Sequence, residues 1–238
     1  MSSVLRAIRR VRRDERGISM AELLVASSVS VLILATLGGF FVATIKGSAS
    51  NASADTNLRQ ATNSINAMSR YLRAATTRAV PSSLVPDAAI VRATPTDLTF
   101  YAYINLIDDA DIAKRTAEKP VLARYYIDPS SRQLVQQLSV CNADVNGYYS
   151  CPAVTSTTRL GGPIASPTSD GIALFTYDNA DSGDLTPVNG QLSDADRASV
   201  RFVTVNLELG SATAGAGSNA HLQNTVGLLN LGRAGATP

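Results

Sequence analysis

An uncharged apolar run near the N-terminus is the feature that most constrains how this chain can fold. None of the 23 residues from Leu23 to Ile45 carries a charge, and Lys46 ends the run. At a helical rise of about 1.5 Å per residue, the run would form a rod of roughly 34 Å, which is long enough to cross the hydrocarbon core of a bilayer. We therefore expect a membrane-spanning helix here.

A basic segment precedes the apolar run. Residues 1–17 contain six arginines and only two acidic residues, Asp14 and Glu15. Positive charge on one flank of an apolar span holds that flank in the cytoplasm. We expect a single-pass protein of the cytoplasmic membrane, with its N-terminus in the cytoplasm and the chain after the span outside it.

Most of the net positive charge lies in this leading segment. The 238 residues have a formal net charge of +2, and residues 1–17 contribute +4, so the remainder carries −2. A slightly acidic remainder implies no basic surface for nucleic acid, so we expect no nucleic-acid partner. Trp is absent and Phe is scarce, whereas small residues are abundant, as in a secreted β-rich domain.

Cys141 and Cys151 are the two cysteines of the chain, with nine residues between them. In an exported domain, a pair this close is expected to form a local disulfide, and closing a short loop typically adds roughly 2–3 kcal/mol of stability. A metal-binding or redox-active pair is the alternative. That alternative lacks the C-x-x-C spacing, and the single histidine, His221, is remote in sequence.

The start of the apolar block combines a basic leader ending in Gly17, an apolar residue at Ile18, a glutamate four residues later at Glu22, and an unbroken apolar stretch. This combination resembles the class III signal of type IV prepilins and type II secretion pseudopilins. Ile18 stands where most family members have Phe, and Ser19-Met20 stands where Thr-Leu is commoner. The resemblance implies that a membrane prepilin peptidase cuts after Gly17 and N-methylates Ile18. The alternative is an ordinary secretory signal, cleaved at one of the alanines shortly after the span.

Glu22 lies in an apolar helix, where an ionised carboxylate costs several kcal/mol unless it is paired. The residues three and four positions later, Val25 and Ala26, offer no basic partner. Cleavage after Gly17 would create an ammonium group on Ile18. The resemblance implies that the ammonium of an incoming subunit neutralises the Glu22 of a neighbour during assembly. The alternative is a solvated Glu22 at headgroup depth, favoured there by the helix dipole.

A second periodic stretch follows the span. Its apolar residues recur at alternating spacings of three and four, as on a helix with one buried face: Leu58, Ala61, Ile65, Met68, Leu72 and Ala75. We expect one long helix from Ile18 to about Arg78 whose far half packs against a sheet, with a break near Gly47 as the alternative. Pro81 and Pro86 would end the helix and open a loop.

Beyond residue 86 the apolar period changes to two, which is the period of strands. The expected strands are residues 97–104, 121–127, 133–140, 171–177 and 198–209. A proline-containing turn at 128–132 joins two of them as a hairpin, and an acidic turn at 178–184 follows another. Residues 155–169 show no clear pattern, residues 210–219 are expected to be a flexible linker, and residues 222–238 have no assigned place.

The order of these elements resembles the J-type minor pseudopilins of type II secretion and the W-type minor pilins of type IV pili. The resemblance is carried by residues 70–75 (RYLRAA), late in the helix, and by residues 174–178 (LFTYD). It implies an α+β pilin fold, in which a long N-terminal transmembrane-to-amphipathic helix packs on an antiparallel sheet. The expected organisation is a cleaved leader, a transmembrane helix, an amphipathic extension and an extracytoplasmic β-rich domain, at residues 1–17, 18–46, 47–80 and 81–238.

Catalytic patterns are missing from the sequence. It contains no G-x-S-x-G, no H-E-x-x-H and no P-loop, so we expect a protein that is not an enzyme and that needs no organic cofactor. One turn gathers oxygen ligands of the kind that Ca²⁺ prefers: Asp178, Asn179, Asp181 and Asp184. The spacing is not that of an EF-hand, and a plain polar hairpin turn is the favoured alternative.

The expected function is that of a minor pilin or pseudopilin, a structural subunit that initiates or caps a filament after cleavage between Gly17 and Ile18. The filament would belong to a type IV pilus or a type II secretion system, at the cell surface or in the periplasm. The resemblance implies three kinds of protein partner: the prepilin peptidase, other pilin or pseudopilin subunits, and an inner-membrane assembly platform. The alternative is a signal-anchored extracytoplasmic binding or adhesin domain that does not polymerise.

Overall fold

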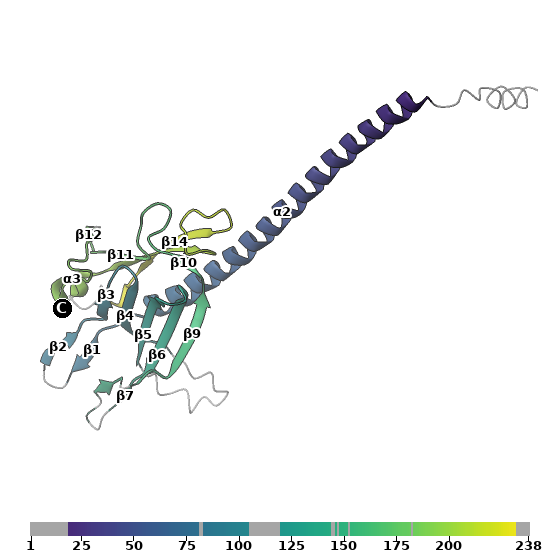
Figure 1. Ribbon diagram of the computed structural model, residues 1–238. Coiled ribbons are helices and arrows are strands. Elements are labelled where there is room, and N and C mark those ends of the chain that lie inside the picture. Colours follow the sequence, from purple (N-terminus) through teal and green to yellow (C-terminus); the bar gives the residue numbers. More distant parts are fainter. Residues whose placement is uncertain are drawn as a thin grey trace, which may run out of the picture. The chain divides into compact units, whose positions relative to one another are not determined.

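Helix α2 (Met20–Arg73) is the first described element of the computed structural model (Figure 1). Its first turn carries Glu22 and its last turn carries Arg70 and Arg73, which is the charge arrangement that a helix dipole favours. The helix runs through Gly47 without a break. The single long helix expected from the sequence is therefore present.

The residues just after α2 pair with a strand of the sheet. Ala75 forms an isolated antiparallel bridge with Ala102, and the Thr76 N–H donates to the Tyr101 carbonyl oxygen at 2.9 Å. Because these bonds replace helical ones, α2 ends earlier than the apolar stripe indicates. Arg78, expected as the last helical residue, instead begins a strand.

The structure describes residues 19–80, 83–104, 120–143, 146, 148–151, 153–181 and 183–231. The chain divides into two compact units, Met1–Ala49 and Ser50–Pro238. The described part of the first unit consists of the apolar part of α2, which runs on from Ser19. The second unit contains the rest of α2 and every described strand, which gives the α+β class that the sequence predicts.

In the second unit, α2 packs one face against the strands (Figure 1). The expected apolar stripe is buried from Ala61 onward: Ala61, Ile65, Met68, Leu72 and Ala75. Leu58 is the exception, because 45% of its surface is exposed. The packing of an amphipathic helix on an antiparallel sheet is thus confirmed.

Five antiparallel strands form the first sheet, in the order β3-β4-β5-β6-β9. Their bounds are β3 Ile90–Ala93, β4 Asp97–Tyr103, β5 Pro120–Ile127, β6 Leu134–Val140 and β9 Ser156–Gly161. The turn expected at 128–132 joins β5 to β6 as a hairpin, with Ile127 opposite Leu134. Strands β4, β5 and β6 confirm three of the expected strands. Strand β9 lies in the segment without a clear pattern.

The second sheet is built around β13 (Phe202–Leu209). Strand β14 (Ala220–Gly227) pairs with the whole of one edge of β13. Strands β11 (Phe175–Asp178) and β10 (Ile164–Ala165) share the other edge, and β12 (Asp184–Leu185) pairs with β11 across the acidic turn. The strands expected at 171–177 and 198–209 are present but begin later, and β14 occupies residues that had no assigned place.

Short elements complete the second unit. Two small antiparallel pairs are β1 (Arg78–Val80) with β2 (Ser83–Asp87), and β7 (Asn142–Ala143) with β8 (Tyr149–Ser150). Helix α3 (Asp194–Ser199) and the 3₁₀ turn η2 (Leu229–Leu231) lie outside the sheets.

A capping residue explains why α3 replaces the start of the expected strand at 198–209. The Ser193 hydroxyl oxygen accepts a hydrogen bond from the Asp196 N–H at 3.2 Å, which satisfies one of the free donors in the first turn of α3. Helical geometry therefore extends to Ser199, and the strand begins only at Phe202.

Aromatic side chains fill the centre of the core. The rings of Phe100 and Tyr125 are stacked with centroids 6.1 Å apart, and the Tyr71 ring of α2 meets Tyr125 edge-on at 6.3 Å. The buried Tyr125 hydroxyl accepts a hydrogen bond from the Gln136 side-chain amide at 2.6 Å, and the Tyr177 hydroxyl donates to the Thr94 carbonyl oxygen at 2.7 Å. Both phenols are thus buried with their polar ends satisfied, as a dry core requires.

Polar bonds also attach α2 to the strands and loops that surround it. The Ser64 hydroxyl donates to the Leu160 carbonyl oxygen at 3.0 Å, and the Asn224 side-chain amide donates to the Ser69 hydroxyl at 2.8 Å. The Asn57 side-chain amide donates to the Ser218 carbonyl oxygen at 2.7 Å. These bonds fix how far α2 is displaced and rotated over the second unit, because each has one allowed geometry.

Candidate assembly site at the start of helix α2

Ser19 and Glu22 cap the N-terminus of α2 reciprocally. The Ser19 hydroxyl oxygen accepts a hydrogen bond from the Glu22 N–H at 3.2 Å, and the Glu22 carboxylate oxygen Oε2 accepts one from the Ser19 N–H at 3.0 Å. This is the capping-box arrangement of a Ser-x-x-Glu sequence, in which two free backbone donors of the helix start are satisfied together. Glu22 therefore has a local role at the helix start, as a partner in this capping box.

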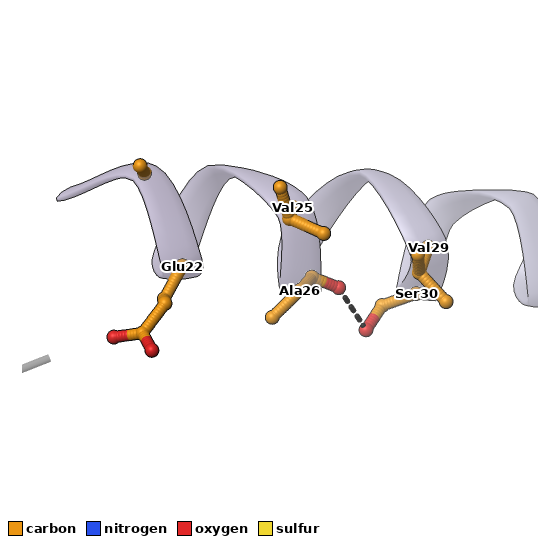
Figure 2. A pocket seen from close by; sticks show the side chains of 6 residues that line it. Glu22, Val25, Ala26, Val29 and Ser30 are labelled. Atoms are coloured by element: carbon orange, nitrogen blue, oxygen red, sulfur yellow. Dashed lines mark hydrogen bonds between the residues drawn. The ribbon is translucent and has the colours of Figure 1, made fainter. Parts of the chain in front are cut away.

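Glu22 stands at one end of a row of small side chains. Figure 2 shows the Glu22, Ala26 and Ser30 side chains on the same side of the helix, one turn apart, with Val25 and Val29 beside them. These residues line a shallow surface hollow. Apart from the carboxylate, the hollow is almost wholly apolar. A second helix of similar shape could therefore approach Glu22 closely along this side.

The hydroxyl groups of this part of α2 are satisfied within the helix. The Ser30 hydroxyl donates to the Ala26 carbonyl oxygen at 2.8 Å (Figure 2), and the Ser27 and Ser28 hydroxyls donate to carbonyl oxygens three residues earlier. Thr36 and Thr44 make equivalent bonds. Such internal bonding makes polar side chains compatible with hydrocarbon. The Glu22 carboxylate differs, because no cation of the described residues pairs with it.

The apolar part of α2 suits a membrane. The helix is long and apolar enough to span a bilayer, with a mean hydropathy of 2.1 over its most apolar window, none of which is buried within the protein. Its large apolar side chains, from Leu23 to Ile45, are at least half exposed. A surface of this kind is unfavourable in water and is expected to be covered by lipid or by neighbouring helices.

The predicted processing residues Gly17 and Ile18 lie outside the described residues. Glu22 is therefore the part of the predicted assembly site that the structure describes. Ser19 belongs to the same site and was not singled out from the sequence. The signal that could have identified it is the spacing Ser-x-x-Glu directly before an apolar run, which predicts a capping box.

The predicted disulfide is present. Cys141 and Cys151 are bonded to each other, directly beyond the end of β6 and after the end of β8. Cys141 is fully buried, and its N–H donates to the Pro120 carbonyl oxygen at 3.0 Å. The bond closes the loop that contains β7 and β8. This is the structural kind of disulfide that we expect in an exported domain.

The predicted calcium residues lie around the turn between β11 and β12. The Asn179 side-chain oxygen accepts hydrogen bonds from the Asp181 and Gly183 N–H groups, both at 2.9 Å, and the Asn179 N–H donates to the Gly183 carbonyl oxygen at 3.1 Å, so Asn179 helps to close the turn. Burial, followed by the hydrogen bond and charge of Asp184, raises the pKa of Asp178. Within the part of the chain that the structure describes, no three His, Cys, Asp or Glu side chains gather closely enough to hold a metal ion. Calcium binding stays a prediction.

Comparisons with known proteins do not assign a function to this site. No family model matches the chain, and no curated protein and no solved structure matches it. The structure itself shows a long N-terminal apolar helix whose C-terminal part packs on antiparallel sheets, which is compatible with a pilin-like fold.

Proposed function

We propose that the protein is a minor pilin or pseudopilin, a structural subunit that initiates or caps a filament of the type IV pilus or type II secretion kind. Its partners would be the prepilin peptidase, related subunits and an inner-membrane assembly platform. It would reside in the cytoplasmic membrane with its N-terminus in the cytoplasm before it enters a filament.

One observation carries this proposal. Glu22 is a carboxylate at the start of an apolar helix, with no cationic partner among the described residues, and it follows a basic leader that ends in glycine. A capping box explains a glutamate at this position only in part, because a glutamine can also complete the box and avoids the cost of a charge near hydrocarbon.

The assembly step would use Glu22 and the new N-terminus together. Cleavage after Gly17 would place an ammonium group on Ile18, next to the Ser19 cap. In a stack of parallel helices, this ammonium would meet the Glu22 carboxylate of an adjoining subunit, beside the row of Ala26 and Ser30. A charge pair in a medium of low dielectric is strong and specific for register, so it would select the position of each subunit.

Processing is the first test. Mass spectrometry of the protein extracted from membranes should find N-methyl-Ile18 at the N-terminus. A chain that still begins at Met1 would contradict the proposal. A chain that begins near Ala54 would instead favour a secreted domain.

Three substitutions separate the charge of Glu22 from its cap. Glu22→Gln keeps an acceptor for the Ser19 N–H but removes the charge, and we expect the variant to stay in the membrane and be excluded from filaments. Ser19→Ala removes a capping bond but keeps the charge, and we expect it to be incorporated. Glu22→Ala should behave like Glu22→Gln. Incorporation is measured by immunoblotting of sheared or purified filaments against the membrane fraction.

Two results would contradict the proposal. If Glu22→Gln is incorporated as well as the unsubstituted protein and Ser19→Ala is not, Glu22 acts as a cap and the charge-pairing mechanism is wrong. If neither substitution matters and the leader is retained, the protein is the anchored binding domain that forms the alternative.

A further inference from the structure

A polar cavity lies in the second unit. Its volume is about 540 Å³, and its lining comes from β1, β2, β3, β4 and α3 together with the residues between β2 and β3. Helix α3 packs against β3, and the β1–β2 hairpin lies near the same end of the sheet (Figure 1). The cavity belongs to no site discussed above.

Two arginines and two carboxylates line this cavity at different depths. The side chains of Arg78 and Arg197 are 23% and 17% exposed, whereas those of their partners Asp87 and Asp194 are 44% and 96% exposed. The guanidinium groups are therefore the inner charges and the carboxylates are the outer ones. An ion pair with a partner as exposed as Asp194 is worth little, because water and salt screen it. An anion from solution can compete with Asp194 for Arg197.

Contacts with the protein hold both arginine side chains in place. Arg197 donates to the Val91 carbonyl oxygen, but its buried Nε–H finds no acceptor in the described part of the chain. Arg78 lies over the Tyr101 ring, 4.8 Å from the centroid, and donates to the Tyr149 carbonyl oxygen at 3.4 Å. The Arg197 guanidinium is fixed on its buried side, and its ion-pair partner Asp194 is exposed, so the side that meets Asp194 is suited to a carboxylate from solution.

We propose that this cavity binds the uronic acid unit of an acidic polysaccharide. The sugar carboxylate would replace Asp194 on Arg197, and ring hydroxyls would donate to Asp87 and bond the Tyr101 hydroxyl. The partly exposed apolar side chain of Val91 would meet the C–H face of the ring.

The mixed lining favours a sugar acid over a simple anion or an apolar ligand. A cavity with both acceptors and donors beside an apolar wall matches a ring that has one carboxylate, several hydroxyls and a C–H face. Burial and the charge of Asp87 raise the pKa of Tyr101 against the opposing charge of Arg78, so its hydroxyl stays protonated at neutral pH and can both donate and accept.

The test uses the full chain in detergent, with galacturonate and glucuronate as probes and ligand-observed NMR titration as the measurement. We expect at least one of the two to bind saturably with a dissociation constant on the order of 1 mM, as fits a single charged sugar unit. Neutral galactose should bind at least about tenfold more weakly, and so should glutarate, which has two carboxylates but no hydroxyls. An acidic dipeptide serves as a further comparison.

Substitutions at Arg197 and Asp194 should change the affinity for uronate in opposite directions. Arg197→Gln should weaken binding of the better uronate at least about tenfold, and Arg197→Lys should weaken it less, because the charge remains but the planar fork is lost. Asp194→Ala should strengthen binding about two- to fivefold, because the competing carboxylate is removed. Since Asp194 is exposed, that variant tests the proposal even if Arg197 variants do not fold. Arg159→Gln, on an exposed strand outside the cavity, should bind as the unsubstituted protein does.

Several results would overturn the inference. They are the absence of saturable binding by both uronates, equal binding of glutarate or of the acidic dipeptide, and unchanged or weaker binding by Asp194→Ala. The uronate-binding proposal is independent of the proposed filament role, because the filament role depends on Glu22 and the processed N-terminus. Glu22→Gln should leave uronate binding unchanged, so the two proposals can fail separately.

Discussion

Two glutamates of this chain have very different surroundings. Glu22 is exposed at the start of α2, whereas Glu208 in β13 is 1% exposed and accepts hydrogen bonds from the Ser169 and Gly215 N–H groups, both at 2.6 Å, and from the Asn219 side chain at 2.7 Å. Burial is the largest single influence and raises the pKa of Glu208, but the hydrogen bonds together outweigh it and lower that pKa to about 2. Glu208 thus ties two loops to the central strand of the second sheet.

We predict that Glu208 makes the second unit sensitive to acid. Its pKa is lower in the folded protein than in the unfolded chain, so its stabilisation is complete above pH ~4.5 and is lost as the pH falls from there toward 2. Glu208→Gln should lower the free energy of unfolding at pH 7 by roughly 3 kcal/mol and flatten the dependence on pH in this window. Thermal unfolding followed by circular dichroism, from pH 2 to pH 7, measures both effects.

The matched control for Glu208 is Asp181→Asn, which changes an exposed carboxylate in the β11–β12 turn. It should leave the midpoint of unfolding unchanged at pH 7. An unfolding midpoint for Glu208→Gln equal to that of the control would show that the buried hydrogen bonds contribute nothing.

At the scale of elements, the amphipathic part of α2 shows how well the spacing of apolar residues predicts which of them are buried. Spacing alone places Leu58 and Leu72 on the same stripe, yet Leu72 is 1% exposed and Leu58 is 45% exposed. The helical period tells which side chains share a face, but only the extent of the packed strands determines how much of that face is covered.

We predict a large difference between two identical substitutions on this stripe. Leu72→Ala should destabilise the protein by about 2–5 kcal/mol, because it removes buried methyl groups and leaves a cavity. Leu58→Ala should cost less than about 1 kcal/mol, because water already reaches that side chain. Chemical denaturation of the two variants under the same conditions compares them directly. Equal costs would mean that the stripe is buried along its whole length.

Strands β9 and β14 show where a pattern of apolar residues could not indicate an element. The side chains of β9 are mostly exposed, and half of the residues of β14 are polar, with Asn224 interrupting the apolar face of Leu222 and Val226. Neither segment therefore has an unbroken apolar alternation, and each is held by backbone hydrogen bonds to another strand of its sheet, β6 or β13. Pairing of this kind has no local signature.

At the scale of the whole molecule, export and the disulfide are linked. A disulfide such as Cys141–Cys151 persists in an oxidising compartment and is reduced in the cytoplasm. The position of the second unit relative to the membrane therefore determines the state of this pair in the cell. Under the proposed orientation, with the basic segment in the cytoplasm, the second unit lies on the oxidising side.

We predict that the two thiols are inaccessible in the cell. Cells lysed in denaturant with a maleimide reagent should give no labelled protein without reductant and two labels per chain after reduction, as read by mass spectrometry. A Cys141→Ser variant is the control, because it should be labelled once without reductant. Labelling of the unsubstituted protein before reduction would place the second unit in the cytoplasm and contradict its export.

The sequence by itself determined the local features: the apolar helix, its buried stripe, the hairpin at 128–132, the strand cores and the disulfide. Each depends on side chains close together in the chain, whose period or spacing reflects one face of one element. The tertiary structure alone decided the partners of β9 and β14, the buried role of Glu208 and the cavity between Arg78 and Arg197. These features bring together segments that are separated in the chain by loops or by other elements, and their burial and pairing follow from how the sheets and α2 pack.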